Sequence, residues 1–241
     1  MQLEELVSIG FEMEEAQKLS GSDGFHHKKK TRQELTDLFD KISRVYGWNF
    51  ENLKRAVLSF PRFAGYDHER VVRQGLEVYG ADNKDKLKRA ILTHPQFAGY
   101  DHERVVRQGL EVYGADNKDK FKRAVLSFPP FAGLDHERVV RQKTRLARMA
   151  GLSNEEAINY ILDLPVLASY SAKRYLAAFD IGRLLEREGF LQDEIMLKVF
   201  FSYCANSPYV PDFSRKRISQ IASDKEPPLL KSMRKRLERI L

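Results

Sequence analysis

The chain has 241 residues, of which 42% are hydrophobic and 31% are charged, so it is long enough and apolar enough to bury a core. Its 41 basic and 34 acidic residues give a net charge of +7, which favours a polyanionic partner. The single cysteine, Cys204, excludes an internal disulfide and a zinc site built on several thiolates.

The N-terminal segment, residues 1–30, reads as a helical cap over Leu3–Leu19 followed by a linker rich in glycine and serine. It lacks the basic and apolar regions of a secretion signal. No stretch approaches the roughly 18 apolar residues of a membrane-spanning helix, so we expect no membrane span. We therefore expect an intracellular protein, in the cytoplasm or nucleoid, or in an organelle if a transit peptide has been removed.

Tandem repeats with a period of 34 residues dominate the middle of the chain. Residues 53–86 recur as residues 87–120 with 30 of 34 residues identical, and a third copy begins at Phe121. More degenerate units precede and follow these copies. The predicted divisions are a half repeat at 31–52, repeats at 53–86, 87–120 and 121–152, degenerate repeats at 153–190 and 191–222, and a basic C-terminal helix at 223–241.

Each repeat is predicted to form two helices. In the second copy Leu87, Ala90 and Ile91 give the first helix an apolar stripe, and Pro95 ends or kinks that helix. Asp101 is a good N-cap for the second helix. Gly114 is placed to end that helix as a C-cap.

Glycines within the second helices, Gly75 and Gly109, recur at the same repeat position. Glycine costs a helix about 1 kcal/mol relative to alanine, so its repetition favours close approach of neighbouring helices, with a kink as the alternative. One helix pair cannot bury both of its faces, so successive pairs should stack. The sequence predicts an all-α fold, a right-handed or curved α-solenoid of stacked two-helix repeats.

A family resemblance follows from the proline-terminated helices. An apolar helix ending in proline, a short loop with an apolar residue and a second helix recur at Pro61, Pro95 and Pro129, most clearly in residues 151–167 (GLSNEEAINYILDLPVL). Over about residues 31–222 this pattern resembles the mitochondrial transcription termination factor family. The resemblance implies a curved helical solenoid that binds nucleic acid through basic residues on its concave face.

This chain departs from that family in its two nearly identical copies and its smaller number of units. The repeat length is also similar to that of TAL-effector DNA-binding repeats, although their signature residues are absent. The Trp-x-x-Leu-Gly pattern of tetratricopeptide repeats is missing too.

Differences between the copies cluster at the end of the first helix. The first two copies differ at only four positions, which lie within six residues. The variable residues predicted to tune base preference are Ser59, Phe60 and Arg62, then Thr93, His94 and Gln96, then Ser127, Phe128 and Pro130. The alternative is drift after a recent duplication, with Phe60 and Phe128 in the core.

Basic residues form two rows, one in the first helices and one in the second helices. Lys84 and Lys88 share a helix face at i, i+4, and stacking would align them with the next copy. Such rows suit a phosphate backbone. The residues predicted to bind it are Lys84, Lys88, Arg89, Lys118, Lys122, Arg123, Arg70, Arg104, Arg107 and Arg138.

Structural explanations of the same charges stay open. The lysines would also suit a solvated face, and the arginines would also pair with Asp67, Glu69 and Glu77 or their copies. Most of the surplus charge lies elsewhere, because residues 213–241 contain nine basic and three acidic residues. That segment would cap the solenoid, hold nucleic acid or bind a membrane surface.

The triplet Asp-His-Glu occurs three times, at residues 67–69, 101–103 and 135–137. Catalytic sites are normally single, so we interpret the triplet as a helix cap with His68, His102 and His136 at the first exposed position. The chain has no phosphate-binding glycine loop and no hydrolase or metalloprotease motif. We expect a non-enzymatic protein with no cofactor and no metal site.

Together these features predict a monomeric, modular nucleic-acid-binding protein whose target is DNA in preference to RNA. The alternative function is a protein-interaction scaffold that recognises a peptide or a partner helix on its concave face.

Overall fold

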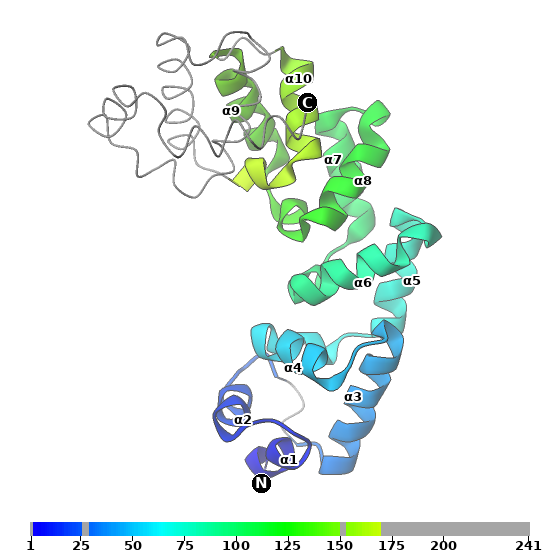
Figure 1. Cartoon of the computed structure of the whole chain (residues 1–241), viewed down its shortest axis with the longest axis vertical. Helices are drawn as coiled ribbons and strands as arrows, with labels where there is room; N and C mark the ends of the chain where they lie inside the picture. Colours follow the sequence, from blue (N-terminus) through cyan, green and yellow to red (C-terminus); the bar gives the residue numbers. More distant parts are fainter. Residues whose placement is uncertain (1, 26–28, 150–152, 170–241) are drawn as a thin grey trace, which may run out of the picture. The chain divides into compact units, whose positions relative to one another are not determined.

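The computed structural model of the chain describes residues 2–25, 29–149 and 153–169 (Figure 1). All regular structure in these ranges is helical and none of it is a β-strand, which confirms the all-α class. The chain divides into two compact units, residues 1–134 and 135–241, and each is described by itself. The second half of the repeat predicted at 153–190, the repeat at 191–222 and the basic helix at 223–241 lie outside the described residues.

The first unit begins with two short helices, α1 (Gln2–Ser8) and α2 (Met13–Ser20), in the region predicted as a helical cap. Gly10 separates them with a φ of 110°. Helix α3 (Arg32–Tyr46) follows, and its Thr31 side chain and Glu34 form a capping box. Helix α1 packs against α2 and α3.

Three proline-terminated helices and two longer partners make up the rest of this unit. The first helices are α4 (Phe50–Ser59), α6 (Lys84–Thr93) and α8 (Lys118–Ser127). The second helices are α5 (His68–Tyr79) and α7 (His102–Tyr113). Each first helix leads into a 3-10 turn, at Pro61–Gly65, Pro95–Gly99 and Pro129–Gly133. Short 3-10 turns at Ala81–Asn83 and Ala115–Asn117 join the pairs.

The predicted helix ends are confirmed. Pro95 follows α6 after one residue and starts the 3-10 turn, because proline has no N–H to continue the α-helical ladder. The Asp101 side chain accepts a hydrogen bond from the Arg104 N–H at 3.0 Å, which caps α7. Gly114 ends α7 with a φ of 89° that disfavours other residues.

Helices of the same kind pack against one another in succession. The first helices pack in the order α4, α6 and α8, and α2 contacts α4 before them. The second helices α5 and α7 contact each other, and α3 contacts α5 before them. Leu53, Leu87 and Phe121 are fully buried at the same position of α4, α6 and α8. The helices of each pair therefore share their core with the pairs before and after.

Close approach explains the glycines within the second helices, as predicted. A Cβ on Gly75 would lie 2.6 Å from Leu87 Cδ2 on the following first helix. A Cβ on Gly109 would overlap the ring of Phe121 on α8. A side chain at Gly109 would push the next helix away, whereas one at Gly75 would require the Leu87 side chain to move.

The described part of the second unit contains α9 (His136–Met149), α10 (Asn154–Asp163) and a 3-10 turn at Pro165–Ser169. Ser153 and Glu156 form a capping box at the start of α10, which packs against α9. Lys143 of α9 stands where the earlier copies have Gly75 and Gly109. Burial lowers the pKa of Lys143 to about 8.

Candidate nucleic-acid interface

A basic groove lies between the first helices α6 and α8 and has a volume of about 490 Å³. Three of its lining side chains are cationic, two carry hydroxyls, two are aliphatic, and none is a carboxylate. The lining residues are Lys86, Arg89, Ala90, Thr93, Arg123, Leu126 and Ser127. We call this feature the α6–α8 groove. No acidic side chain in the lining of this groove neutralises its positive charge.

The helical repeat places these side chains on one flank of α6. Lys86, Arg89 and Thr93 are spaced at i, i+3 and i+7, so they lie along one side of the helix. The small side chain of Ala90 leaves room between the two helices. Arg89 and Arg123 are exposed, and no carboxylate of the described residues lies within 4.0 Å of either guanidinium.

Hydroxyl groups in the groove are already engaged by their own helices. Thr93 Oγ1 donates to the carbonyl oxygens of Arg89 and Ala90, both at 3.1 Å. Ser127 Oγ donates to the Ala124 carbonyl oxygen at 3.0 Å. The free hydrogen-bond donors in the groove are therefore the ammonium and guanidinium groups.

Charge is separated between the two kinds of helix. Helix α6 contains four basic residues and one acidic residue, and α8 has the same composition of charges. Helices α5 and α7 each contain two arginines and two glutamates. Positive charge therefore gathers on the first helices, while the second helices are neutral overall.

The predicted lysine row lies on the other flank of the first helices. Lys118 and Lys122 line a separate hollow of about 590 Å³, together with Arg107. Three glutamates and three aliphatic side chains complete it, namely Glu77, Glu103, Glu111, Val78, Val106 and Leu110. In the preceding copy, burial and the neighbouring Lys84 lower the pKa of Lys88. Lys118 and Lys122 thus face a surface of mixed charge and do not line the α6–α8 groove with its variable hydroxyls.

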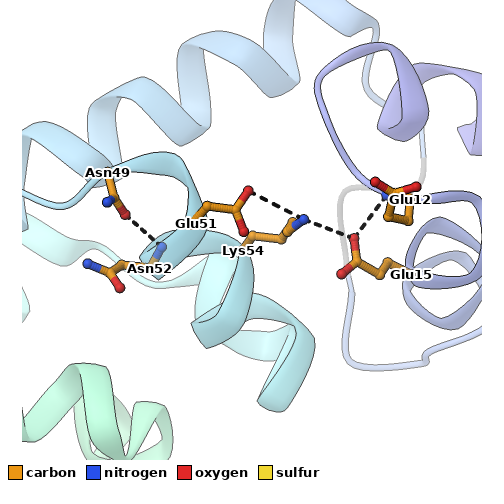
Figure 2. A network of polar contacts seen from close by, with 6 residues as sticks. All are labelled: Glu12, Glu15, Asn49, Glu51, Asn52 and Lys54. Carbon is orange, nitrogen blue, oxygen red and sulfur yellow. Dashed lines mark hydrogen bonds and ion pairs between the residues drawn. The ribbon is translucent and has the colours of Figure 1, made fainter.

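In the first copy, the lysine at this repeat position is Lys54, and it forms ion pairs within the protein. Lys54 Nζ on α4 lies 3.3 Å from Glu15 Oε2 on α2 and 3.4 Å from Glu51 Oε1, as Figure 2 shows. The Glu15 carboxylate also accepts a hydrogen bond from the Glu12 N–H at 2.9 Å, which holds it at the start of α2. Glu15 therefore fixes the N-terminal helices to the edge of α4, and Lys54 is unavailable to a ligand.

The predicted arginine row in the second helices is exposed. Arg70 and Arg104 lie on α5 and α7, and Arg138 lies on α9. No carboxylate of the described residues lies within ion-pair distance of these three guanidinium groups. Asp67 instead caps α5 by accepting from the Arg70 N–H at 3.2 Å, and Glu69 lies 3.7 Å from Lys41 Nζ.

The variable residues occupy the ends of the first helices and the turns that follow. Of these positions, Ser59, Thr93, Ser127 and Arg62 are exposed, and Phe60, His94, Gln96, Phe128 and Pro130 are half-buried. The Arg62 side chain lies against Gly24. The rings of Phe60 and His94 pack near Tyr66 and Tyr100, with centroids 6.2 and 6.4 Å apart. Only Thr93 and Ser127 of this set line the α6–α8 groove.

The prediction that the repeated histidines are exposed is wrong. His68, His102 and His136 are only 4%, 5% and 8% exposed. Tyr46 Oη lies 3.0 Å from His68 Nδ1, and Tyr79 Oη lies 3.3 Å from His102 Nδ1. Each of these two histidines turns back from the start of one second helix onto a tyrosine near the end of the previous one, so the pair joins successive repeats.

Two cationic residues of this surface were not predicted as binding residues from the sequence. Lys86 lines the α6–α8 groove, and Arg55 on α4 stands at the position of Arg89 and Arg123. The spacing of Lys86, Arg89 and Thr93 was a usable signal for a shared flank. The i, i+4 spacing of Lys84 and Lys88 places them on one flank of the helix but does not determine which flank borders a groove.

Within residues 2–25, 29–149 and 153–169, no three side chains of histidine, cysteine, aspartate or glutamate come together as a metal site would require. None of the helices in these ranges has the length and apolar composition needed to cross a bilayer. Models of known protein families, curated proteins and solved structures were compared with the chain, and none of them matches it.

Proposed function

We propose that this chain is a curved α-solenoid of two-helix repeats that binds the phosphate backbone of nucleic acid in the α6–α8 groove. The observation that carries the proposal is a groove lined by Lys86, Arg89 and Arg123 with no carboxylate in its wall. Guanidinium groups bind phosphate through paired hydrogen bonds, and each phosphate they neutralise releases condensed counterions.

Duplex DNA is the proposed target, in preference to RNA. Proteins that hold single strands usually supply aromatic side chains on which unstacked bases lie. The lining of the α6–α8 groove contains no aromatic residue, and the rings of His94 and Phe128 beside it are half-buried, which limits stacking of free bases on them. A groove with cationic donors and short side chains is better suited to the backbone of a duplex, whose bases stay stacked.

A salt titration of binding to a random-sequence DNA duplex tests this proposal. We expect measurable binding at about 50 mM salt and a steep loss at about 200 mM, because each phosphate contact contributes about −0.9 to the slope of log K against log salt. Absence of binding at low salt would refute the proposed function. Tighter binding of a single-stranded RNA of the same length would refute the preference for duplex DNA.

Charge reversal in the groove is expected to weaken this binding. Arg89→Glu combined with Arg123→Glu should lower duplex affinity by roughly 100-fold or more, since each charged contact is worth about 1.5–3 kcal/mol. The matched control, with the same change in net charge, combines Arg44→Glu and Arg73→Glu, which alter exposed arginines of α3 and α5 outside the groove. Both variants are measured by fluorescence anisotropy. Equal losses in the two variants would mean that general surface charge, and not the groove, holds the duplex.

Sequence preference is proposed to come from the variable residues at the ends of the first helices. Thr93 and Ser127 line the groove, and His94 and Phe128 follow them directly. Replacing Phe60 and Arg62 by histidine and glutamine makes the first copy match the second at these two positions. We expect this exchange to change the sequences recovered from a random-duplex selection. Unchanged sequences would assign the differences between copies to drift.

The hollow lined by Lys118 and Lys122 favours the second candidate function, a protein-interaction scaffold. Its lining combines the apolar side chains of Val78, Val106 and Leu110 with charges of both signs, a composition that suits an amphipathic helix. A helical peptide there would bind with little dependence on salt, because opposite charges on its rim screen each other. The same salt titration therefore separates the two candidates.

A further inference from the structure

Free arginines continue beyond the α6–α8 groove, and we call the row of Arg55, Arg89 and Arg123 the basic edge. Arg55 of α4 is exposed, and no carboxylate of the described residues lies within 4.0 Å of its guanidinium. It occupies the repeat position of Arg89 and Arg123, one turn before Ser59. The three arginines therefore belong to three helices that pack in succession, α4, α6 and α8.

The step from α4 to α6 repeats the chemistry of the groove. Where α6 presents Arg89, Ala90 and Thr93 toward α8, helix α4 has Arg55, Ala56 and Ser59 in the same register. Ser59 Oγ donates to the Ala56 carbonyl oxygen at 3.0 Å, as Ser127 Oγ does to the carbonyl oxygen of Ala124. Asn52 stands in place of Lys86. Each step along the first helices thus offers a guanidinium group and no competing hydroxyl donor.

We propose that the bound strand runs across the first helices, from α4 over α6 to α8, with one phosphate contact on each of Arg55, Arg89 and Arg123. This inference rests on the proposed function and adds Arg55 and the direction of the strand. Packed helices are about 8–10 Å apart. A duplex strand rises about 3.4 Å per nucleotide and turns about once per 10 base pairs, so its neighbouring phosphates lie about 6–7 Å apart along the strand. Successive helices therefore meet phosphates that are one or two nucleotides apart.

This direction also brings the bases to the variable positions. A strand lying on the arginine row passes Ser59, Thr93 and Ser127, which lie one turn further along their helices. The residues after them, among them Phe60 and His94, begin the turns that differ between the copies. Phosphate contact and base contact would then be supplied by successive turns of each first helix.

The salt dependence of duplex binding tests the inference. The variants Arg55→Gln, Arg89→Gln and Arg123→Gln are compared with Arg73→Gln, and each is bound to the same random-sequence duplex between about 50 and 200 mM salt. We expect each of the first three to reduce the slope of log K against log salt by about 0.9, and Arg73→Gln to leave the slope unchanged. Circular dichroism establishes that each variant is folded, as expected for exposed positions.

The outcomes separate this inference from the proposed function. Loss of slope in Arg89→Gln and Arg123→Gln, but not in Arg55→Gln, would overturn the extended row and leave binding in the α6–α8 groove intact. No binding by the unaltered chain would overturn both.

Discussion

Acidification from pH 6.5 to about pH 4 is expected to reduce the free energy of unfolding by about 3 kcal/mol for each of His68 and His102. Burial lowers the pKa of both imidazoles from 6.5 to about 4. The Nε2 atom of each ring is buried without a hydrogen-bond partner, so burial of a charged ring is poorly compensated at both positions.

The sign follows from which state binds the proton. Between pH 6.5 and pH 4 the unfolded chain takes up protons on these histidines and the folded chain does not, so stability falls as the pH falls. The stabilisation by the neutral histidines is fully present above the pKa of the unfolded state, and it is lost once the pH falls to the pKa of the folded state. Burial dominates these shifts, since the Phe63 backbone and Asp67 raise the pKa of His68, Lys41 lowers it, and Asp101 raises that of His102.

Urea unfolding at a series of pH values measures this effect. The variant with His68→Gln and His102→Gln should lose about two thirds of the histidine contribution in this range, because His136, whose pKa burial also lowers to about 4, keeps its share. The variant His94→Gln, at a half-buried position, should retain most of the contribution. The pKa values themselves are read from the histidine ring resonances of the unaltered protein by NMR. Values near 6.5 for His68 and His102 in the folded state would contradict the expected result.

Substitution of Gly109 by alanine should destabilise the protein by about 2 kcal/mol. Alanine favours a helix by about 1 kcal/mol over glycine, but its Cβ would overlap the rigid ring of Phe121. Overpacking of this kind costs about 1–3 kcal/mol, or more when the neighbour cannot move. At the equivalent Gly75 the facing atoms are the terminal methyl groups of Leu87, which rotate aside more readily.

The repeats provide the matched control for this substitution. In a Phe121→Leu background the second interface has the same pair of residues as the first, so Gly109→Ala should cost no more there than Gly75→Ala costs in the unaltered chain. Free energies of unfolding in denaturant give both values. An equal cost of Gly109→Ala with and without the Phe121 ring would show that helix packing is not the cause.

Much of the fold could be predicted from the sequence because its signals are local. Pro95 lacks an N–H, Asp101 accepts from the next turn, and Gly114 permits a positive φ, and each property acts within a few residues. Gly109 was informative for another reason, since only close packing compensates for glycine within a helix. The helix boundaries and the succession of pairs follow from these residues.

The surface chemistry was harder to predict because it depends on neighbouring helices. Helical spacing placed Lys84 and Lys88 on one face of α6, but which flank borders a groove is decided by the contact between α6 and α8. The same limit explains His102, which looked exposed as the first residue of α7 but is covered by Tyr79 of the previous second helix. Contacts between repeats were not encoded in any short motif.

The ion pair between Lys54 and Glu15 gives the basic edge a fixed starting point. Helix α2 packs on α4, contains two glutamates and one lysine, and follows Glu12. A phosphate chain extended past Arg55 would approach this acidic helix and be repelled. Nuclease footprinting of a complex would then show one sharp boundary on the DNA, at the end bound by α4. On a long duplex, every bound protein would begin its phosphate contacts at its α4 end.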